Sequence, residues 1–177
     1  MKLRLLPVLV SVVISASVLF GGWFAYQSYA MENPLESIVA KTPGVDLVNT
    51  RITNNEAIVE LKLQPGTSLR ETYAKIQNES TAFLGKKELK LKVVNDTTPE
   101  MEQWWSSALF DVAQAMETRH YAQIPTTLQS RVKNASDMKV ATEMDDKFVF
   151  ITLTDGDKSK YVMLPRTPEK MGVWPNE

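Results

Sequence analysis

Residues 5–25 read Leu-Leu-Pro-Val-Leu-Val-Ser-Val-Val-Ile-Ser-Ala-Ser-Val-Leu-Phe-Gly-Gly-Trp-Phe-Ala. This run contains no Asp, Glu, Lys, Arg, Asn or Gln. A helix of about 20 residues rises about 30 Å, which is the thickness of the hydrocarbon core of a bilayer. The run therefore predicts one membrane-spanning helix, which we place at residues 5–26, and it decides the layout of the rest of the chain.

The residues that flank this run predict its orientation. Lys2 and Arg4 precede it, and positively charged residues stay on the cytoplasmic side of a membrane. We therefore expect residues 1–4 to form a cytoplasmic tail and everything after the helix to lie outside the cytoplasm. Aromatic residues, which suit the headgroup layer, gather where the helix would leave the membrane: Trp23, Phe24, Tyr26 and Tyr29. Together with Lys2 and Arg4, they are the predicted membrane-interface residues.

A cleaved secretory signal is the alternative. Ser28-Tyr29-Ala30 places small residues where a signal peptidase cuts, and cleavage after Ala30 would give a secreted protein that begins at Met31. The apolar segment of a signal peptide is usually about 7 to 15 residues long, and this run is longer, which favours the uncleaved anchor. Both interpretations place the remaining residues outside the cytoplasm.

Composition limits what this remainder can do. The chain has 20 Lys and Arg against 21 Asp and Glu, and residues 1–30 hold two of the basic residues and no acidic one, so the remainder has 18 against 21 and a net charge of −3. Nucleic-acid binding and electrostatic attachment to anionic lipid need a basic surface, so we expect neither. The chain has no cysteine, which excludes disulfides, thiolate metal sites and cysteine nucleophiles.

Residues 27–43 contain two prolines and little apolar periodicity, which predicts a tether with room for one helical turn. Alternation of apolar and polar residues predicts strands at 45–53, 56–63 and 86–94. Asn54-Asn55 is expected to join the first two as a hairpin, because Asn tolerates a left-handed backbone. Between the second and third strands, a capping box of Ser68 and Glu71 should open a helix that Gly85 ends.

The second half begins with the longest predicted helix after the anchor. A capping box of Thr97 and Glu100, with Pro99 in the first turn, opens it, and it runs to about Arg119. Trp104 lies at the edge of its apolar stripe, and Phe110 points away from it. We expect the stripe itself to be buried, and it consists of Trp105, Ala108, Leu109, Val112 and Met116.

A shorter helix using Leu128 and Val132 should follow within residues 121–136. A three-stranded meander then occupies residues 138–144, 148–154 and 161–164, with turns at Asp145-Asp146 and Asp155-Gly156. The predicted class is α+β: a transmembrane helix, then a two-layer α/β extracytoplasmic domain at 44–164, with halves 44–95 and 96–164. It has about six strands, two main helices and a short one, in the order β-β-α-β-α-α-β-β-β.

No residue pattern in the chain indicates a reaction. The single histidine, His120, follows the long helix, where a cation complements the helix dipole. Asp145, Asp146, Asp155 and Asp157 could hold calcium, but their positions favour turns. We therefore assign no catalytic residue, no metal ligand and no cofactor, and we expect the protein not to be an enzyme.

Residues 165–177 form a Pro-rich tail with three large apolar residues, Met171, Val173 and Trp174. Disordered tails are usually poor in such residues, so we expect this tail to dock on its own domain or in a partner's groove. With Trp104 and Phe110, these three are the candidate partner-binding residues. The resulting hypothesis is a membrane-anchored envelope module that binds the bilayer through its N-terminal helix and binds another envelope protein or itself. The rivals are a tethered or secreted carboxylate-dependent hydrolase and a ligand-sensing domain.

Overall fold

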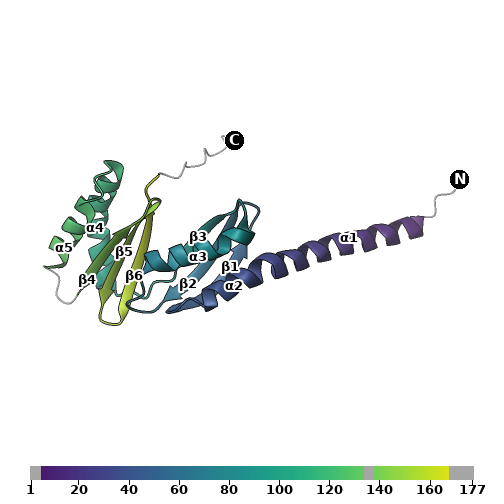
Figure 1. Cartoon of the computed structure of the whole chain (residues 1–177), viewed down its shortest axis with the longest axis horizontal. Helices are drawn as coiled ribbons and strands as arrows, with labels where there is room; N and C mark the ends of the chain where they lie inside the picture. Colours follow the sequence, from purple (N-terminus) through teal and green to yellow (C-terminus); the bar gives the residue numbers. More distant parts are fainter. Residues whose placement is uncertain (1–4, 134–137, 168–177) are drawn as a thin grey trace. The chain divides into compact units, whose positions relative to one another are not determined.

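The computed structural model of the chain describes residues 5–133 and 138–167, and Figure 1 shows its elements. Within these ranges the chain is mixed α+β, as predicted, with two three-stranded sheets of order β1-β2-β3 and β4-β5-β6. Lys2, Arg4 and the tail residues Met171, Val173 and Trp174 lie outside the described residues. The elements are α1 (Leu5–Gln27), a π-helical turn (Ser28–Glu32), α2 (Asn33–Ala40), β1 (Val45–Ile52), β2 (Glu56–Leu63), α3 (Leu69–Leu84), β3 (Glu88–Val93), α4 (Pro99–Glu117), α5 (Gln123–Val132), β4 (Lys139–Met144), β5 (Phe148–Asp155) and β6 (Lys158–Pro165).

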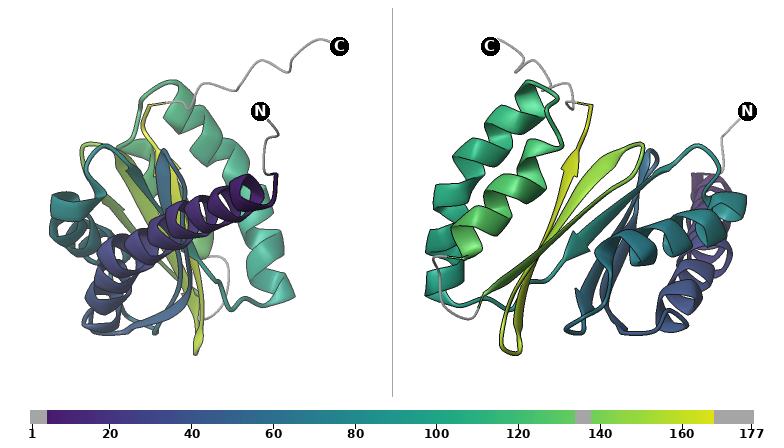
Figure 2. Two further views of the ribbon diagram at one scale, coloured as in Figure 1. Left: turned by 90° about the vertical axis from the view of Figure 1, so that its right-hand side faces the viewer. Right: turned by 60° about the vertical axis from the view of Figure 1, so that its left-hand side comes forward.

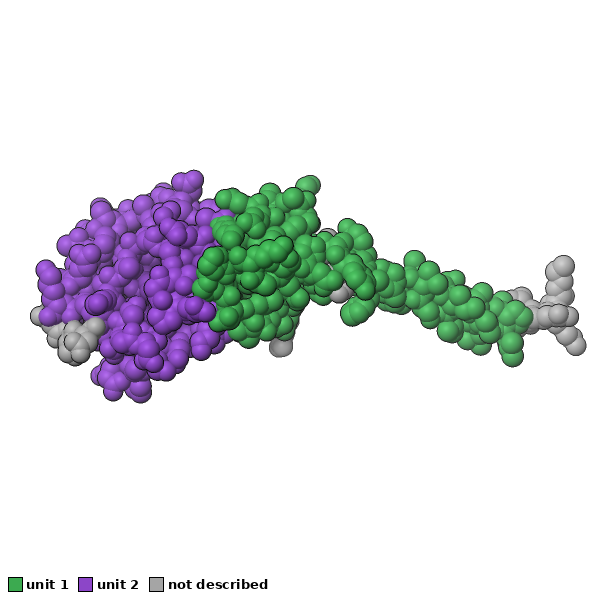
Figure 3. Space-filling model, turned by 60° about the horizontal axis from the view of Figure 1, so that its bottom comes forward, with its two compact units in different colours: residues 1–61, 75–92 green, residues 62–74, 93–177 purple. Residues whose placement is uncertain are grey.

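The chain divides into two compact units, which Figure 3 colours separately. The first contains residues 1–61 and 75–92, and the second contains residues 62–74 and 93–177. Both β2 and α3 contribute to each unit. Residues 62–74, which are the end of β2, the connection and the start of α3, therefore belong to the same unit as the sheet of β4, β5 and β6.

Helix α1 confirms that the N-terminal apolar run is helical. Its segment Leu6–Tyr26 is long and apolar enough to cross a membrane, and no part of it is buried against the rest of the chain. The aromatic residues at its end, Trp23, Phe24, Tyr26 and Tyr29, are also exposed. Trp23 and Tyr26 lie side by side, with 6.3 Å between their ring centroids.

The segment predicted as a tether is helical instead. The π-helical turn follows α1 directly, and α2 then places Leu35 and Val39 one turn apart, with both side chains fully buried. Pro34 lies in the first turn of α2, where its missing N–H leaves no hydrogen bond unmade. The Thr42 hydroxyl donates to the Ile38 carbonyl (2.9 Å) after the helix ends. The prolines therefore bound a packed helix of 8 residues, which is longer than the single helical turn that we had allowed for.

The first sheet confirms the three predicted strands and corrects one turn. The Thr53 N–H donates to the Glu56 carbonyl (2.8 Å), and the Glu56 N–H donates to the Thr53 hydroxyl (3.1 Å). Such a short connection joins antiparallel neighbours. Neither Asn54 nor Asn55 has a positive φ, so the predicted left-handed asparagine turn is wrong. The Thr53 side chain closes the turn in its place.

Strand β3 begins beside the start of β2, since the Glu88 N–H donates to the Asn55 carbonyl (2.8 Å) and Lys90 pairs with Glu56 (2.9 Å). The two strands therefore run in the same direction, and α3 is the crossover between them. The Glu71 N–H donates to the Ser68 hydroxyl (3.2 Å), which confirms the predicted start of this helix. Gly85 ends it at φ 60°, also as predicted.

The second sheet is the predicted antiparallel meander, in which Ile151 of the central strand pairs with Thr142 on one side and with Val162 on the other. Its turns have the expected chemistry. The Asp145 carboxylate accepts the N–H groups of Lys147 and Phe148 (both 2.7 Å). Gly156 adopts φ 58° in the second turn. The acidic residues of these turns are therefore turn formers, as we expected.

Helices α4 and α5 lie on the same side of this sheet in both views of Figure 2. The core between them consists of Trp105, Ala108, Val112, Ala115, Ile124, Leu128, Val149 and Ile151. The stripe predicted for α4 was wrong at two positions, because Leu109 is 42% exposed and Met116 is only half-buried. Met101 and Ala115 are buried instead. The N-cap is Thr98, which accepts the Met101 N–H (3.2 Å), so the predicted capping box was one residue early.

The opposite face of the second sheet packs against the start of α3. The Tyr73 ring lies 5.1 Å from Phe148 in an edge-to-face arrangement and 6.0 Å from Phe150. Glu143 of β4 accepts hydrogen bonds from the Ser68 hydroxyl (2.8 Å) and from Arg70 Nε (3.0 Å). Ser68 therefore both caps α3 and ties its first turn to the sheet.

Candidate functional site

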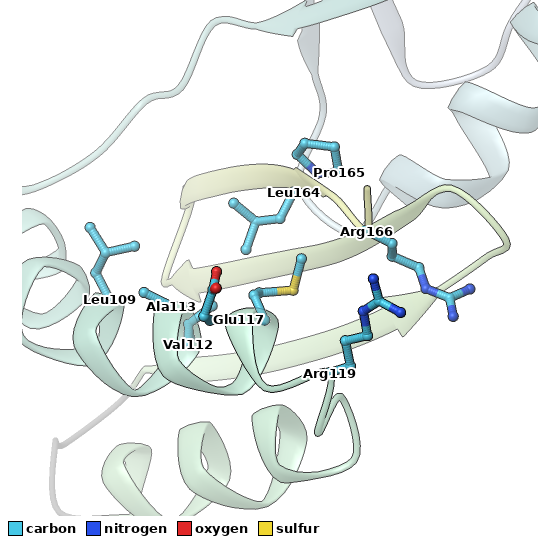
Figure 4. A pocket seen from close by; sticks show the side chains of 9 residues that line it. Leu109, Val112, Ala113, Glu117, Arg119, Leu164, Pro165 and Arg166 are labelled. Carbon is cyan, nitrogen blue, oxygen red and sulfur yellow. The ribbon is translucent and has the colours of Figure 1, made fainter. Parts of the chain in front are cut away.

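An apolar groove of about 400 Å³ runs along α4 beside the end of β6. Figure 4 shows the side chains that line it. Arg119 and Arg166 lie at one end, and Glu117 lies farther along, near Ala113 (Figure 4). Most of the lining side chains are apolar, and the full set is Leu109, Val112, Ala113, Met116, Glu117, Arg119, Leu164, Pro165 and Arg166. A groove of this size and lining is large enough to take a small ligand or a few side chains of a peptide.

The groove is apolar because α4 has apolar side chains on its flank toward β6 in addition to those that face the core. Val112 faces the core and forms the floor, whereas Leu109 and Met116 lie on the flank toward β6. Ala113 is small and leaves the space above it open. The two residues wrongly assigned to the core are therefore walls of the groove.

Arg166 closes the charged end of the groove and is held firmly. Its guanidinium lies over the Tyr121 ring, 4.8 Å from the centroid. Its Nη1 donates to the backbone carbonyls of Asp145 (2.9 Å) and Asp146 (3.1 Å). Its Nε is buried and has no hydrogen-bond partner in the described part of the chain. A second cavity of about 200 Å³ adjoins the groove and shares Arg119 and Arg166 with it.

Arg119 has an unusual backbone. Its φ is 57°, and among residues 5–133 and 138–167 it is the one non-glycine residue with a positive φ. The Arg119 N–H donates to the Met116 carbonyl (3.2 Å) and the His120 N–H to the Ala115 carbonyl (2.9 Å), which is the helix ending that normally uses glycine. A side chain in this conformation costs about 1 kcal/mol or more. The strain therefore lies at the mouth of the groove.

His120 takes part in this helix ending through its backbone. Its side chain is exposed, and no described hydroxyl or carboxylate is hydrogen-bonded to it. A hydrolytic triad needs such a nucleophile and such an acid beside the imidazole. The position of His120 at the end of α4 is thus as predicted, and residues 5–133 and 138–167 place no such triad around it.

The five predicted partner-binding residues fall in different places. Phe110 is 79% exposed on α4, next to Leu109 and Ala113 of the groove, so the prediction that it points away from the core is confirmed. Trp104 is half-buried at the edge of the core, also as predicted. The remaining three, Met171, Val173 and Trp174, lie outside the described residues. Sequence reasoning missed Arg119, Arg166 and Leu164. The sequence held a signal for Arg119 alone: neither Gly nor Asn follows the end of α4, so a residue with a larger side chain had to adopt the left-handed backbone there.

A smaller cavity of about 140 Å³ brings two acids together on the other side of β6. Asp157 lines it, and so does Asp96, whose carboxylate accepts both its hydrogen bonds from Lys158 (3.0 and 2.9 Å). This hydrogen bond lowers the pKa of Asp96 and raises that of Lys158. Tyr161 donates its hydroxyl to the Gln64 carbonyl (3.1 Å), and burial raises its pKa. Asp96 therefore acts as a structural tie here.

None of these three cavities has, among the described residues, a cluster suited to a metal. The described residues hold no group of three or more His, Asp or Glu side chains close enough to share an ion. No protein-family model matches the chain, and no curated protein or solved structure matches it. The features of the chain that bear on its function are the groove, the exposed side of α4 and α1.

Proposed function

We propose that the protein is a membrane-anchored module whose part beyond α1 lies outside the cytoplasm and binds another protein of the cell envelope. The observation that carries the proposal is Phe110, which is 79% exposed on α4 beside an apolar groove of about 400 Å³. Aromatic side chains that are exposed next to a cleft are frequent anchors of protein interfaces. The partner surface is the side of α4 that carries Phe110.

The anchor is supported by the surface of α1. Large aliphatic and aromatic side chains such as Leu9, Phe20 and Phe24 are more than half exposed along its whole length. Each such side chain gains roughly 1.5 to 3 kcal/mol on leaving water, so the helix is far more stable in a bilayer than in solution. Lys2 and Arg4 would keep the N-terminus in the cytoplasm.

Extraction of membranes with alkaline carbonate tests the anchor. The full chain should stay in the membrane fraction, because one spanning helix resists extraction. A soluble product that begins at Met31 would instead show that the helix is a cleaved signal and would disprove the anchor.

A photo-crosslinking amino acid tests the partner surface. Placed at Phe110 in the full chain in its native membrane, it should give an adduct of defined mass that mass spectrometry identifies. Gln129, which is exposed on α5 and does not line the groove, is the control position and should give no adduct. An adduct of twice the chain mass would identify the partner as a second copy. Equal labelling at both positions would refute the surface.

A ligand-sensing domain is the second candidate, because the volume of the groove falls within the range of small-molecule sites. An anionic amphiphile would place its apolar part along Val112 and Leu164 and its charge near Arg119. Titration of the purified chain with a fluorescent fatty acid tests this candidate, and Leu164→Glu should abolish the binding. The carboxylate-dependent hydrolase has less support, since Asp96 is already engaged by Lys158.

A further inference from the structure

The groove along α4 borders the last residues that the structure describes. Pro165 and Arg166 line it, so residues 168–177 begin at its edge. An extended chain covers at most about 3.5 Å per residue, which lets seven residues reach about 24 Å. The groove follows about ten residues of α4, or about 15 Å. Trp174 can therefore reach every part of it.

The composition of these residues matches the lining of the groove. Trp174 is a large apolar side chain that water solvates poorly, and in an extended segment it can face the groove while its apolar neighbours Met171 and Val173 face the opposite way. The groove offers Val112 and Leu164 as an apolar floor and has open volume above Ala113. Prolines at positions 168 and 175 reduce the conformational entropy that the segment would lose on binding. The close attachment to the groove also gives the segment a high effective concentration there.

Arg119 provides a second, independent observation. It lines the groove and its side cavity, is exposed, and has no ion pair within residues 5–133 and 138–167. A glycine would relieve its left-handed backbone. Strained backbone of this kind concentrates at binding sites, where the side chain has a use. A guanidinium stacks well on the face of an indole.

We propose that the groove along α4 binds the chain's own residues 171–174, with the Trp174 indole against Val112 and Leu164 and stacked on Arg119. The bound segment covers Leu109 and Met116, the two apolar side chains of α4 that line the groove and that the core buries only in part. Phe110 stays exposed beside it. The inference concerns the isolated chain and does not depend on the partner proposed above.

Disulfide trapping in the full chain in lipid nanodiscs tests the proposal, because the chain has no cysteine of its own. Position 172 is two residues before Trp174, so a cysteine placed there points to the same side as the Trp174 indole in an extended segment. The Ala113→Cys, Gly172→Cys pair should form an intramolecular disulfide about ten times faster than the Gln103→Cys, Gly172→Cys pair, since docking raises the local concentration only at the groove. Equal rates for the two pairs would overturn the proposal, and so would disulfides formed mainly between chains.

Two further substitutions in the Ala113→Cys, Gly172→Cys chain test the named contacts. Trp174→Ser should bring the rate down to that of the Gln103 control. Arg119→Gly should slow the reaction severalfold without lowering the melting temperature, which separates loss of stacking from loss of folding. An unchanged rate in the Trp174→Ser chain would show that the indole does not hold the segment in place. Because the purified chain is used alone, any of these failures leaves partner binding at Phe110 standing.

Discussion

Trp105→Ala should be the most damaging single substitution in α4. Trp105 is 8% exposed and packs within the core that includes Val112, Leu128 and Ile151. A tryptophan buries about 200 Å² of surface, and at about 25 cal/mol per Å² this corresponds to about 5 kcal/mol. Part of the resulting cavity will collapse and alanine keeps some contact, so we expect a loss of about 3 to 5 kcal/mol.

Differential scanning calorimetry of the full chain in lipid nanodiscs measures this loss. For a protein of this size, each kcal/mol shifts the melting temperature by roughly 2 to 4 °C, so Trp105→Ala should lower it by roughly 10 °C. Phe110→Ala is the matched control on the same helix. It should change stability by less than about 0.5 kcal/mol, because its side chain is 79% exposed.

Trp104→Ala should fall between these two, since Trp104 is half-buried at the edge of the core. The order of the three costs depends only on which face of α4 meets the sheet. A loss below about 1 kcal/mol for Trp105→Ala, or a loss for Phe110→Ala as large as that for Trp105→Ala, would show that α4 is rotated from the position described here.

Three other predictions concern single side chains. Hydrogen bonding to Lys160 lowers the pKa of Glu102 in the folded protein. The stability that this pair contributes is therefore present above the usual carboxyl pKa of about 4.3, and it is lost as the pH falls through the lower pKa of the folded protein. Lys160→Met should remove this loss, so the melting temperature should depend less on pH in that range. His120→Ala should change the free energy of unfolding by less than about 0.5 kcal/mol in urea denaturation, because its cap is made by the backbone. Gly156→Ala should cost about 1 kcal/mol in the same assay, since φ is 58° and an added Cβ meets nothing within 4 Å.

The helices and strands after residue 44 could be predicted because each depends on residues that are close together in the sequence. Alternating apolar residues specify the strands, and Ser68 and Gly85 mark the ends of α3 through hydrogen bonds that span only a few residues. The same local rules place the Asp145 turn. The rules failed at α2, because two buried residues, Leu35 and Val39, give too short a pattern to register as a helix.

The contacts between elements that are distant in the sequence could not be predicted, and the reason is physical. Ser68, Arg70 and Tyr73 contact Glu143 and Phe148, whose positions lie about seventy residues later in the chain. The spacing of apolar residues does not predict such a distant contact. A polar residue at the start of a helix makes the same N-cap hydrogen bond whichever sheet lies beside it. The packing of residues 62–74 in the second unit therefore had to come from the structure.

The candidate groove and the error about α4 have the same cause. A helical pattern counts apolar residues but cannot tell which of two adjoining flanks meets the sheet, so Leu109 and Met116 were assigned to the core. Ala115 lies in the core with Val149 and Ile151 of the central strand β5, whereas Leu109 and Met116 line the groove beside the edge strand β6. Leu109 is 42% exposed and Met116 is only half-buried, so the core uses neither side chain in full. Two incompletely buried apolar side chains that flank one open space, as Leu109 and Met116 do beside Arg119, support the binding role that we propose for this side of α4.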